Sequence, residues 1–255
     1  MMSVLLPAAL AFVLGACLGS FVAACSYRMP RDISIVFPAS HCPRCQEHIA
    51  WFANVPVLGY VFCRGRCLHC HGSISPLYPL LEASLGLLFA AVTFHFLPDI
   101  PQVIWYLSLV FFLFACGVID AVSASQFGGG EGIIPDFFSV GGLVAGLALA
   151  IWFGHFAASL AGALAGGGIL LAVYLYYRYV RQIEALGLGD VKMLAMIGAF
   201  VGVTGVLYTL FLASLTGLAA AVFFMIYHRS FSLQMKIPFG PFLALGALLV
   251  VFVRG

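Results

Sequence analysis

The stretch that decides the fold is residues 137–177, whose sequence is FFSVGGLVAGLALAIWFGHFAASLAGALAGGGILLAVYLYY. These 41 residues include no Lys, Arg, Asp or Glu. A membrane-spanning helix needs about 20 predominantly apolar residues, because the helix rises about 1.5 Å per residue and the hydrocarbon core of a bilayer is about 30 Å thick. The stretch therefore has the length of two spans, and Phe153, Gly154 and His155 are the expected hairpin between them.

The composition of the whole chain agrees with a lipid environment. Hydrophobic residues make up 64% of the 255 residues and charged residues only 8%, against about 25% in a soluble domain. The mean hydropathy is +1.13 and the net charge is +2. So few charges would not cover the surface of a soluble domain, and they exclude a disordered chain and a nucleic-acid binder with a basic face. We therefore predict a polytopic membrane protein.

Charge-free stretches elsewhere in the chain mark further spans. The same length criterion predicts an all-α fold with about eight transmembrane helices and one polar loop, residues 27–75, between the first two. The expected helices occupy, approximately, residues 4–26, 76–96 and 100–119, two segments within 137–177, two segments between Asp190 and Tyr227 that are separated at Gly202–Gly205, and residues 237–253.

The distribution of basic residues predicts the orientation of the chain. Cytoplasmic loops carry an excess of Lys and Arg. With the N-terminus outside, 10 of the 11 basic residues fall on the cytoplasmic side, namely Arg28, Arg31, Arg44, Arg64, Arg66, Arg178, Arg181, Lys192, Arg229 and Lys236. Asp120, at the end of the third expected helix, and Asp190, at the start of the sixth, then lie on that same side.

Four cysteines of the polar loop have the spacing of a metal site. Cys42 and Cys45 form one CxxC pair, and Cys67 and Cys70 form a second pair after 21 intervening residues. This spacing lets two tight turns present four thiolates to a tetrahedral ion, so we predict a structural, zinc-ribbon-like Zn²⁺ site. The alternatives are a redox pair or four unmetallated thiols, and Cys63 is an alternative ligand to Cys67.

Placing an acidic side chain at membrane depth costs free energy, so acidic residues found there are candidates for function. Asp120, Asp136, Asp190 and Glu82 meet this condition. In Gly187-Leu188-Gly189-Asp190, two glycines allow another backbone to approach the carboxylate closely. Two adjacent carboxylates share one proton and are able to activate water and protonate a peptide carbonyl. The structural alternative is that Asp190 caps its helix and Asp120 marks a helix end.

The order of these motifs resembles that of a type IV prepilin peptidase over nearly the whole chain. The segments that carry the resemblance are Gly19-Ser20-Phe21, Tyr27-Arg28-Met29-Pro30, His41 to Cys45, Asn54-Val55-Pro56, Gly65 to Cys70, Ile74-Ser75, Tyr78-Pro79, Glu82, Ile119-Asp120, Ile134-Pro135-Asp136 and Gly187 to Lys192. The resemblance implies a multi-pass aspartic endopeptidase of the bacterial inner membrane, with its active site at the cytoplasmic face. Its substrates would be prepilins or type II secretion pseudopilins, cleaved after a Gly.

The resemblance also assigns roles to residues. It implies that Asp120 and Asp190 are the catalytic pair, and that supporting positions are held by Gly187, Gly189, Lys192, Asp136 and Glu82. It divides the chain into a first helix (1–26), a zinc-binding loop associated with methyl transfer (27–75) and a transmembrane peptidase domain (76–255). Many members of the family also methylate the new N-terminal residue with S-adenosylmethionine.

The sequence departs from the family pattern at two places. Asp136 follows Asp120 by sixteen residues instead of about eight, so either residue remains a candidate for the first acid. A Gly-rich insertion over residues 126–132 accounts for the difference and is either a passive surface loop or a mobile cover over the acids. Ala23 stands where the family tends to have an Asn, which bears on methyl transfer more than on peptide cleavage.

Other functions remain as alternatives. A presenilin-type protease shares the Gly-x-Gly-Asp motif but lacks such a zinc loop. A transporter or proton channel would explain the intramembrane acids but leaves the two CxxC pairs unexplained. The third alternative is a zinc-stabilised membrane scaffold that performs no chemistry.

Overall fold

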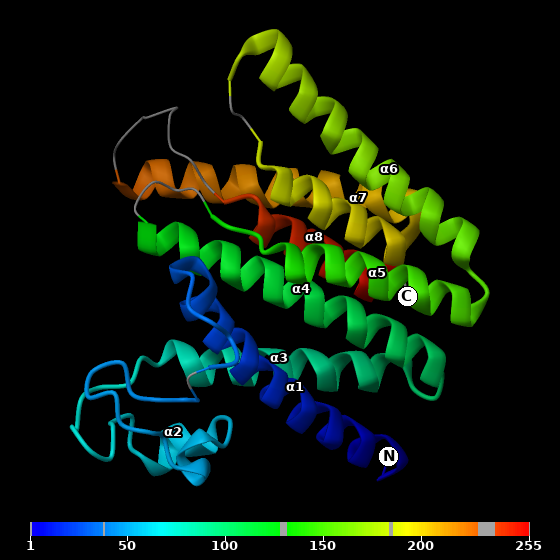
Figure 1. Ribbon diagram of the computed structural model, residues 1–255. Coiled ribbons are helices and arrows are strands. Elements are labelled where there is room, and N and C mark those ends of the chain that lie inside the picture. The colour runs from blue at the N-terminus through cyan, green and yellow to red at the C-terminus, as the bar shows by residue number, and fades with distance from the viewer. Residues whose placement is uncertain (1, 38, 128–131, 184–185, 229–237, 255) are drawn as a thin grey trace. The chain divides into compact units, whose positions relative to one another are not determined.

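The computed structural model describes residues 2–37, 39–127, 132–183, 186–228 and 238–254 (Figure 1). This part of the chain forms two compact units, Met1–Leu97 and Pro98–Gly255. Within it, every regular element is a helix, and the only extended pairing consists of two isolated bridges. The predicted all-α class is therefore confirmed. Residues 128–131 of the Gly-rich insertion lie outside the described residues, so the two interpretations of that insertion stay predictions.

The first unit consists of two long helices and the polar loop that joins them. Helices α1 (Met2–Arg28) and α3 (Leu77–Phe96) are both long and apolar enough to cross a membrane. The loop between them holds three short helices, η1 (Met29–Arg31), η2 (Trp51–Asn54) and α2 (Leu58–Phe62). The predicted position of the polar loop, between the first two membrane-spanning helices, agrees with this arrangement.

Glycines bring the backbones of α1 and α3 into contact. A Cβ atom on Gly15 would lie 2.7 Å from the carbonyl oxygen of Leu85, and one on Gly19 would lie 2.8 Å from the Cα atom of Glu82. Small residues are typical of helix pairs in lipid, where close van der Waals packing takes over from the hydrophobic effect. The packing fixes Glu82 against α1, and the Glu82 side chain is buried.

The second unit contains five long helices. They are α4 (Ile100–Phe127), α5 (Asp136–Phe153), α6 (Phe156–Leu175), α7 (Leu188–His228) and α8 (Gly240–Arg254). A short π-helix, η3 (Tyr176–Arg181), extends α6. The predicted hairpin between α5 and α6 is present, because Gly154 ends α5 with a φ of 78°, a conformation that glycine adopts at little cost.

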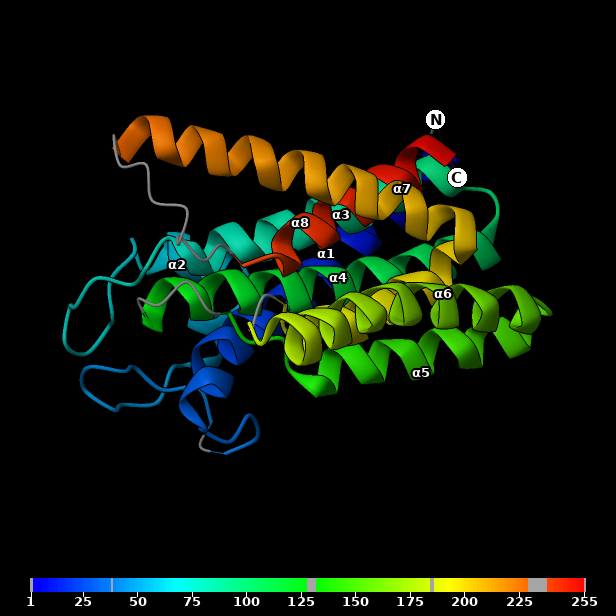
Figure 2. The ribbon, with the colours of Figure 1, turned by 90° about the horizontal axis from the view of Figure 1, so that it is seen from above.

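Helix α7 is interrupted where the sequence predicts a break. Gly202 has a φ of 70° and a ψ of 179°, which is not helical. Figures 1 and 2 both show the chain doubling back at this point, so that the two halves of α7 run in opposite directions. Six helices of the described chain have the length and apolarity of a membrane span, and α8 is a shorter apolar helix. Counting the two halves of α7 separately, these make up the eight helical segments expected.

Helix α4 is longer than the sequence predicted. We expected the third helix to end at Asp120, but α4 continues through Phe127. The reason is local: residues 121–127 contain neither Gly nor Pro, so nothing stops the helix before the glycines that follow. Asp120 consequently lies inside the helix, about two turns before its end.

The core of the second unit is formed mainly by α4, the first half of α7 and α8. Its fully buried side chains include Leu109, Leu113, Ile119, Met193, Ile197 and Leu243. Figures 1 and 2 show the last turns of α4 and the first turns of α7 and α8 at the same end of this unit. The helices that carry Asp120 and Asp190 are thus brought to one end of the fold.

Candidate active site

Asp120 is an acid enclosed by backbone. Its exposed fraction is only 4%. The backbone N–H of Gly240, the first residue of α8, donates a hydrogen bond to Oδ2 of Asp120 over 3.0 Å. A Cβ atom on Gly240 would lie 2.6 Å from the same oxygen, and a Cβ atom on Gly132 would overlap the other carboxylate oxygen. Two glycines therefore leave just enough space for this carboxylate.

Asp190 lies in the first turn of α7 and is partly buried. Its carboxylate interacts with the backbone amide of Gly187, and Asp120 is close enough to act on it electrostatically. Oδ2 of Asp190 would lie 3.6 Å from a Cβ atom on Gly187. The two acids, which are 70 positions apart in the sequence, are therefore electrostatic neighbours.

The extended segment Gly132–Pro135 connects the elements around the two acids. The N–H of Ile133 donates to Oγ of Ser123 over 2.8 Å, and that hydroxyl donates to the carbonyl oxygen of Asp120 over 3.0 Å. The side chain of Ile134 fits between α7 and α8, within 2.9 Å of a Cβ atom on Gly189 and 3.1 Å of one on Gly240. The segment thus fixes the starts of α7 and α8 beside Asp120.

Asp136 and Lys192 form an ion pair away from the carboxylate of Asp120. Nζ of Lys192 lies 2.6 Å from Oδ1 of Asp136, and the two side chains are 39% and 66% exposed, respectively. Asp136 begins α5 and Lys192 belongs to the first turns of α7, so the pair connects these helices at the surface. Of the two candidates for the first acid, Asp120 is the enclosed one and Asp136 is engaged by a lysine.

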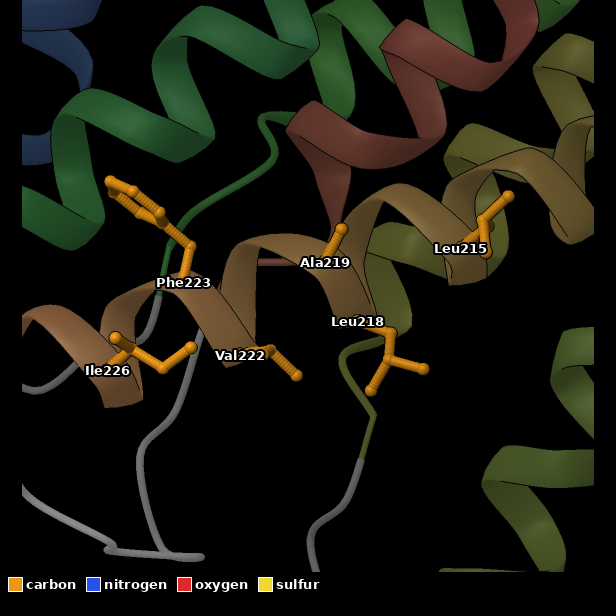
Figure 3. Close-up of a pocket in the computed structure, with 6 residues that line it drawn as sticks. All are labelled: Leu215, Leu218, Ala219, Val222, Phe223 and Ile226. Carbon is orange, nitrogen blue, oxygen red and sulfur yellow. The ribbon is translucent and has the colours of Figure 1, made fainter.

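An open hollow on α7 contains no ionisable group. Its volume is about 490 Å³, and Figure 3 shows the six apolar side chains that line it. They are Leu215, Leu218, Ala219, Val222, Phe223 and Ile226. All belong to the second half of α7, which is part of a candidate membrane span. This surface is suited to lipid chains and offers no group for acid or base chemistry.

The four predicted cysteine ligands meet in the first unit. The Sγ atoms of Cys42, Cys45, Cys67 and Cys70 all lie within 4.8 Å of one another. The distance is 3.9 Å between Cys42 and Cys70, and 4.0 Å between Cys45 and Cys67. Zinc–sulfur bonds of about 2.3 Å in a tetrahedron place the sulfur atoms about 3.8 Å apart, so the cluster has the dimensions of a zinc site. Cys67 takes part in this cluster, and the alternative ligand Cys63 does not.

The two halves of the cluster are structurally equivalent, offset by 25 residues. The N–H of Cys42 donates to the carbonyl oxygen of Glu47, and that of Cys67 donates to the carbonyl oxygen of Gly72, both over 2.9 Å. Isolated bridges close each turn, His41 with His48 and Arg66 with Ser73. In each half, a hydrogen bond from the backbone N–H of the second cysteine lowers the pKa of the first, to about 7 for Cys42.

Glu82 connects the zinc-binding loop to α3. The N–H of Val57 donates to Oε2 of Glu82 over 2.6 Å, across 25 positions of sequence. Val57 has a φ of 62°, an unusual conformation for a β-branched residue. A strained backbone and a buried carboxylate are stabilised together by this bond. Glu82 belongs to the first unit, and this contact places it with the loop.

Sequence reasoning missed three residues around Asp120: Gly240, Gly132 and Ser123. Ser123 resembles any small polar residue in a helix, and Gly132 is one of several glycines in an insertion. A signal for Gly240 is present in Phe239-Gly240-Pro241, because Pro in the first helical turn commonly marks a helix start. That signal predicts where α8 begins but not that its first amide binds Asp120.

Two sequence families match the chain. Residues 13–96 match the bacterial peptidase A24 N-terminal domain, and residues 109–222 match the type IV leader peptidase family. The chain belongs to the type IV leader peptidase family. The boundary between the two family matches falls close to the boundary between the two compact units, at Leu97 and Pro98. The finer division into residues 1–26, 27–75 and 76–255 stays a prediction.

Similar proteins carry names of the same kind. A prepilin leader peptidase/N-methyltransferase of Klebsiella pneumoniae is 36% identical over 80% of this chain and 89% of its own length. Proteins with the same name from Pseudomonas putida and Dickeya chrysanthemi are 31% and 32% identical over 95% of this chain, and over 89% and 92% of their own lengths. No solved structure matches the chain significantly.

Proposed function

We propose that this chain is a membrane aspartic endopeptidase that removes the leader peptide of prepilins or pseudopilins, and that Asp120 and Asp190 are its catalytic acids. The observation that carries the proposal is the enclosed carboxylate of Asp120 with Asp190 as its electrostatic neighbour at one end of the second unit. Membership of the type IV leader peptidase family and the names of the similar proteins support the substrate class.

In the proposed mechanism, the two carboxylates share one proton. The ionised carboxylate takes a proton from a water molecule as that water attacks the scissile carbonyl carbon. The protonated carboxylic acid donates its proton to the carbonyl oxygen, which gives a neutral tetrahedral intermediate without a covalent bond to the enzyme. The N–H of Gly240 holds Oδ2 of Asp120 in place, which fixes the orientation of this carboxylate.

We propose Asp120 and not Asp136 as the first acid. Asp136 is paired with Lys192 at 2.6 Å, and its side chain is 66% exposed. An exposed carboxylate held by a lysine suits a surface contact between helices and not an enclosed pair of acids. Lys192 and Asp136 then act together by holding the start of α5 against the start of α7. Gly187 and Gly189 act by leaving space for the chain around Asp190.

We also propose that the first unit holds one Zn²⁺ ion between Cys42, Cys45, Cys67 and Cys70. The sulfur–sulfur distances support this metal. Four sulfur ligands leave no open coordination position, so the ion would hold the loop together and take no part in peptide cleavage.

A second activity, methylation of the new N-terminus, is proposed from the names of the similar proteins. The methyl group would pass from the sulfonium of S-adenosylmethionine to the free amine, with loss of a proton and formation of S-adenosylhomocysteine. We propose that the loop over residues 27–75 serves this activity.

The proposed location is the bacterial inner membrane, with the catalytic acids at the cytoplasmic face. The apolar helices support a multi-pass membrane protein. The cytoplasmic position of the acids is supported by the positive-inside rule. With most basic residues in the cytoplasm, the end of α4 and the start of α7 lie on that side as well.

Incubation of the purified chain in detergent with a full-length prepilin tests the function. We expect a product shortened by the leader peptide, whose new N-terminus mass spectrometry identifies as the residue after a Gly. A transporter or a zinc-stabilised scaffold would leave the prepilin intact under conditions where an established leader peptidase cleaves it. Added S-adenosylmethionine should increase the mass of the product by one methyl group.

A further inference from the structure

The zinc-binding loop carries a surface that is unexpectedly apolar for a segment between two membrane helices. Trp51 and Phe52 of η2 are 83% and 45% exposed. Leu58, Val61 and Phe62 of α2 are 53%, 62% and 71% exposed. These five side chains form what we call the η2–α2 face. Several exposed apolar side chains on two short helices that pack together indicate a site that contacts another surface or a membrane.

The packing of the loop explains why these side chains point outward. A Cβ atom on Gly59 would overlap the carbonyl group of Ala53, so α2 packs on η2 through its smallest residue. Gly59 is buried, while its large neighbours Leu58 and Phe62 are exposed. The loop is thus folded with its bulky apolar residues on the outside.

The bond between Val57 and Glu82 fixes the depth of α2. Glu82 lies five residues into α3, which corresponds to about 7.5 Å along the helix axis from Leu77. Helix α3 has 20 residues, which is about the length needed to cross the hydrocarbon core. Glu82, five residues from the start of this helix, therefore lies below the membrane surface. Val57 donates to Glu82 at this depth, and α2 begins at the next residue.

We propose that the η2–α2 face is a membrane anchor that inserts into the boundary between lipid headgroups and acyl chains. Short amphipathic segments bury their apolar side about 5–10 Å into this boundary, which agrees with the depth set by Glu82. Trp is enriched at the same level of the bilayer. Arg64 and Arg66 are exposed directly after α2, where their guanidinium groups reach anionic headgroups.

The anchor gives the loop a defined place at the membrane surface. The loop is already connected to the bilayer through α1 and α3, and the η2–α2 face adds a third contact between these connections. This inference depends on α3 spanning the membrane and is independent of the proposed peptidase activity.

Fluorescence quenching by brominated lipids tests the anchor. The full-length protein and its Trp51→Phe variant are reconstituted into vesicles of phosphatidylcholine and phosphatidylglycerol, and the difference between their emission spectra isolates Trp51 from Trp105 and Trp152. We expect bromine atoms on the upper part of the acyl chain to remove most of the Trp51 emission. Aqueous iodide should have little effect on it.

Each other outcome overturns the proposal. Quenching by iodide and not by brominated lipid would place the face in water. Protection from both quenchers would mean that protein covers it, either the second unit or another chain. Protection that develops only when prepilin is added would make it a substrate surface.

Two further variants serve as a second test and its control. Phe62→Ser should reduce the quenching by brominated lipid, whereas Leu68→Ser should not, because Leu68 is comparably exposed but lies between Cys67 and Cys70 and outside the face. If Trp51→Phe does not fold, Phe62→Trp in the otherwise natural chain adds an emission at the same surface. An added emission that brominated lipid leaves unchanged would refute the anchor.

Discussion

The contact between Gly240 and Asp120 makes Gly240→Ala an informative substitution. The added Cβ atom would lie 2.6 Å from Oδ2 of Asp120, while ordinary contact begins at 3.4 Å, so one of the two must shift by about 0.8 Å. The carboxylate is the end of a side chain and moves more easily than the backbone of α8. We therefore expect Asp120 to be displaced and the fold to be retained.

The expected loss follows from the displaced hydrogen bond. A hydrogen bond to a charged group contributes about 1.5–3 kcal/mol, and each 1.4 kcal/mol is a factor of about ten in rate. A catalytic group that is misplaced by about 1 Å loses activity to a similar extent, about 100-fold. Gly240→Ala should therefore reduce kcat/KM for prepilin cleavage by about 10- to 150-fold.

The assay is cleavage of purified prepilin in detergent, followed by gel densitometry over a range of substrate concentrations. Gly168→Ala is the matched control, because a Cβ atom on this helical glycine meets nothing within 4 Å. Both variants should keep the zinc content and melting temperature of the natural protein. Natural activity in a folded Gly240→Ala protein would refute the role of this contact in catalysis.

Four further predictions follow from the same geometry. Asp120→Asn and Asp190→Asn should each abolish cleavage while leaving membrane insertion unchanged, because each removes one member of the shared-proton pair; residual activity above background in either variant would contradict the pairing. Asp136→Asn should retain at least about one fifth of the natural rate, because an exposed ion pair contributes about 1 kcal/mol or less. An inactive Asp136→Asn together with an active Asp120→Asn would make Asp136 the first catalytic acid in place of Asp120. Metal analysis of the purified protein should find about one zinc ion per chain, and Cys42→Ser or Cys67→Ser should lose it, whereas Cys63→Ser should keep it. Glu82→Ala should destabilise the zinc-binding loop by about 1–3 kcal/mol by leaving the N–H of Val57 unpaired, whereas Glu82→Gln keeps an acceptor and should be mild; equal protease resistance of the loop in both variants would argue against this bond.

The helical architecture could be predicted from the sequence because its signal is local. Membrane-spanning helices need long apolar stretches, so the absence of charges over residues 137–177 was enough to predict two of them. The hairpin at Gly154 and the break at Gly202 followed from the same reasoning. The end of the third helix was misjudged because Asp120 was taken as a terminus, although its neighbours favour helix up to Phe127.

The cluster of four cysteines was also predictable, for a different reason. The CxxC spacing restricts each pair of thiols to one tight turn, so Cys42 with Cys45 and Cys67 with Cys70 are close before any tertiary contact forms. The choice of Cys67 over Cys63 required the structure, because it depends on how the second turn folds against the first.

The sequence by itself determined which groups were available to this protein: apolar helices, four thiols at fixed spacing, and a few acids at membrane depth. Only the tertiary structure decided which of these acids has which surroundings. Asp120 and Asp136 are alike in sequence terms, yet the first is enclosed by the amide of Gly240 and the second is paired with Lys192 at the surface. The physical reason is that the hydrogen bond from Gly240 to Asp120 spans 120 positions and depends on where α8 begins relative to α4. The packing of the helices sets the position of α8 beside α4, and no local sequence pattern specifies it.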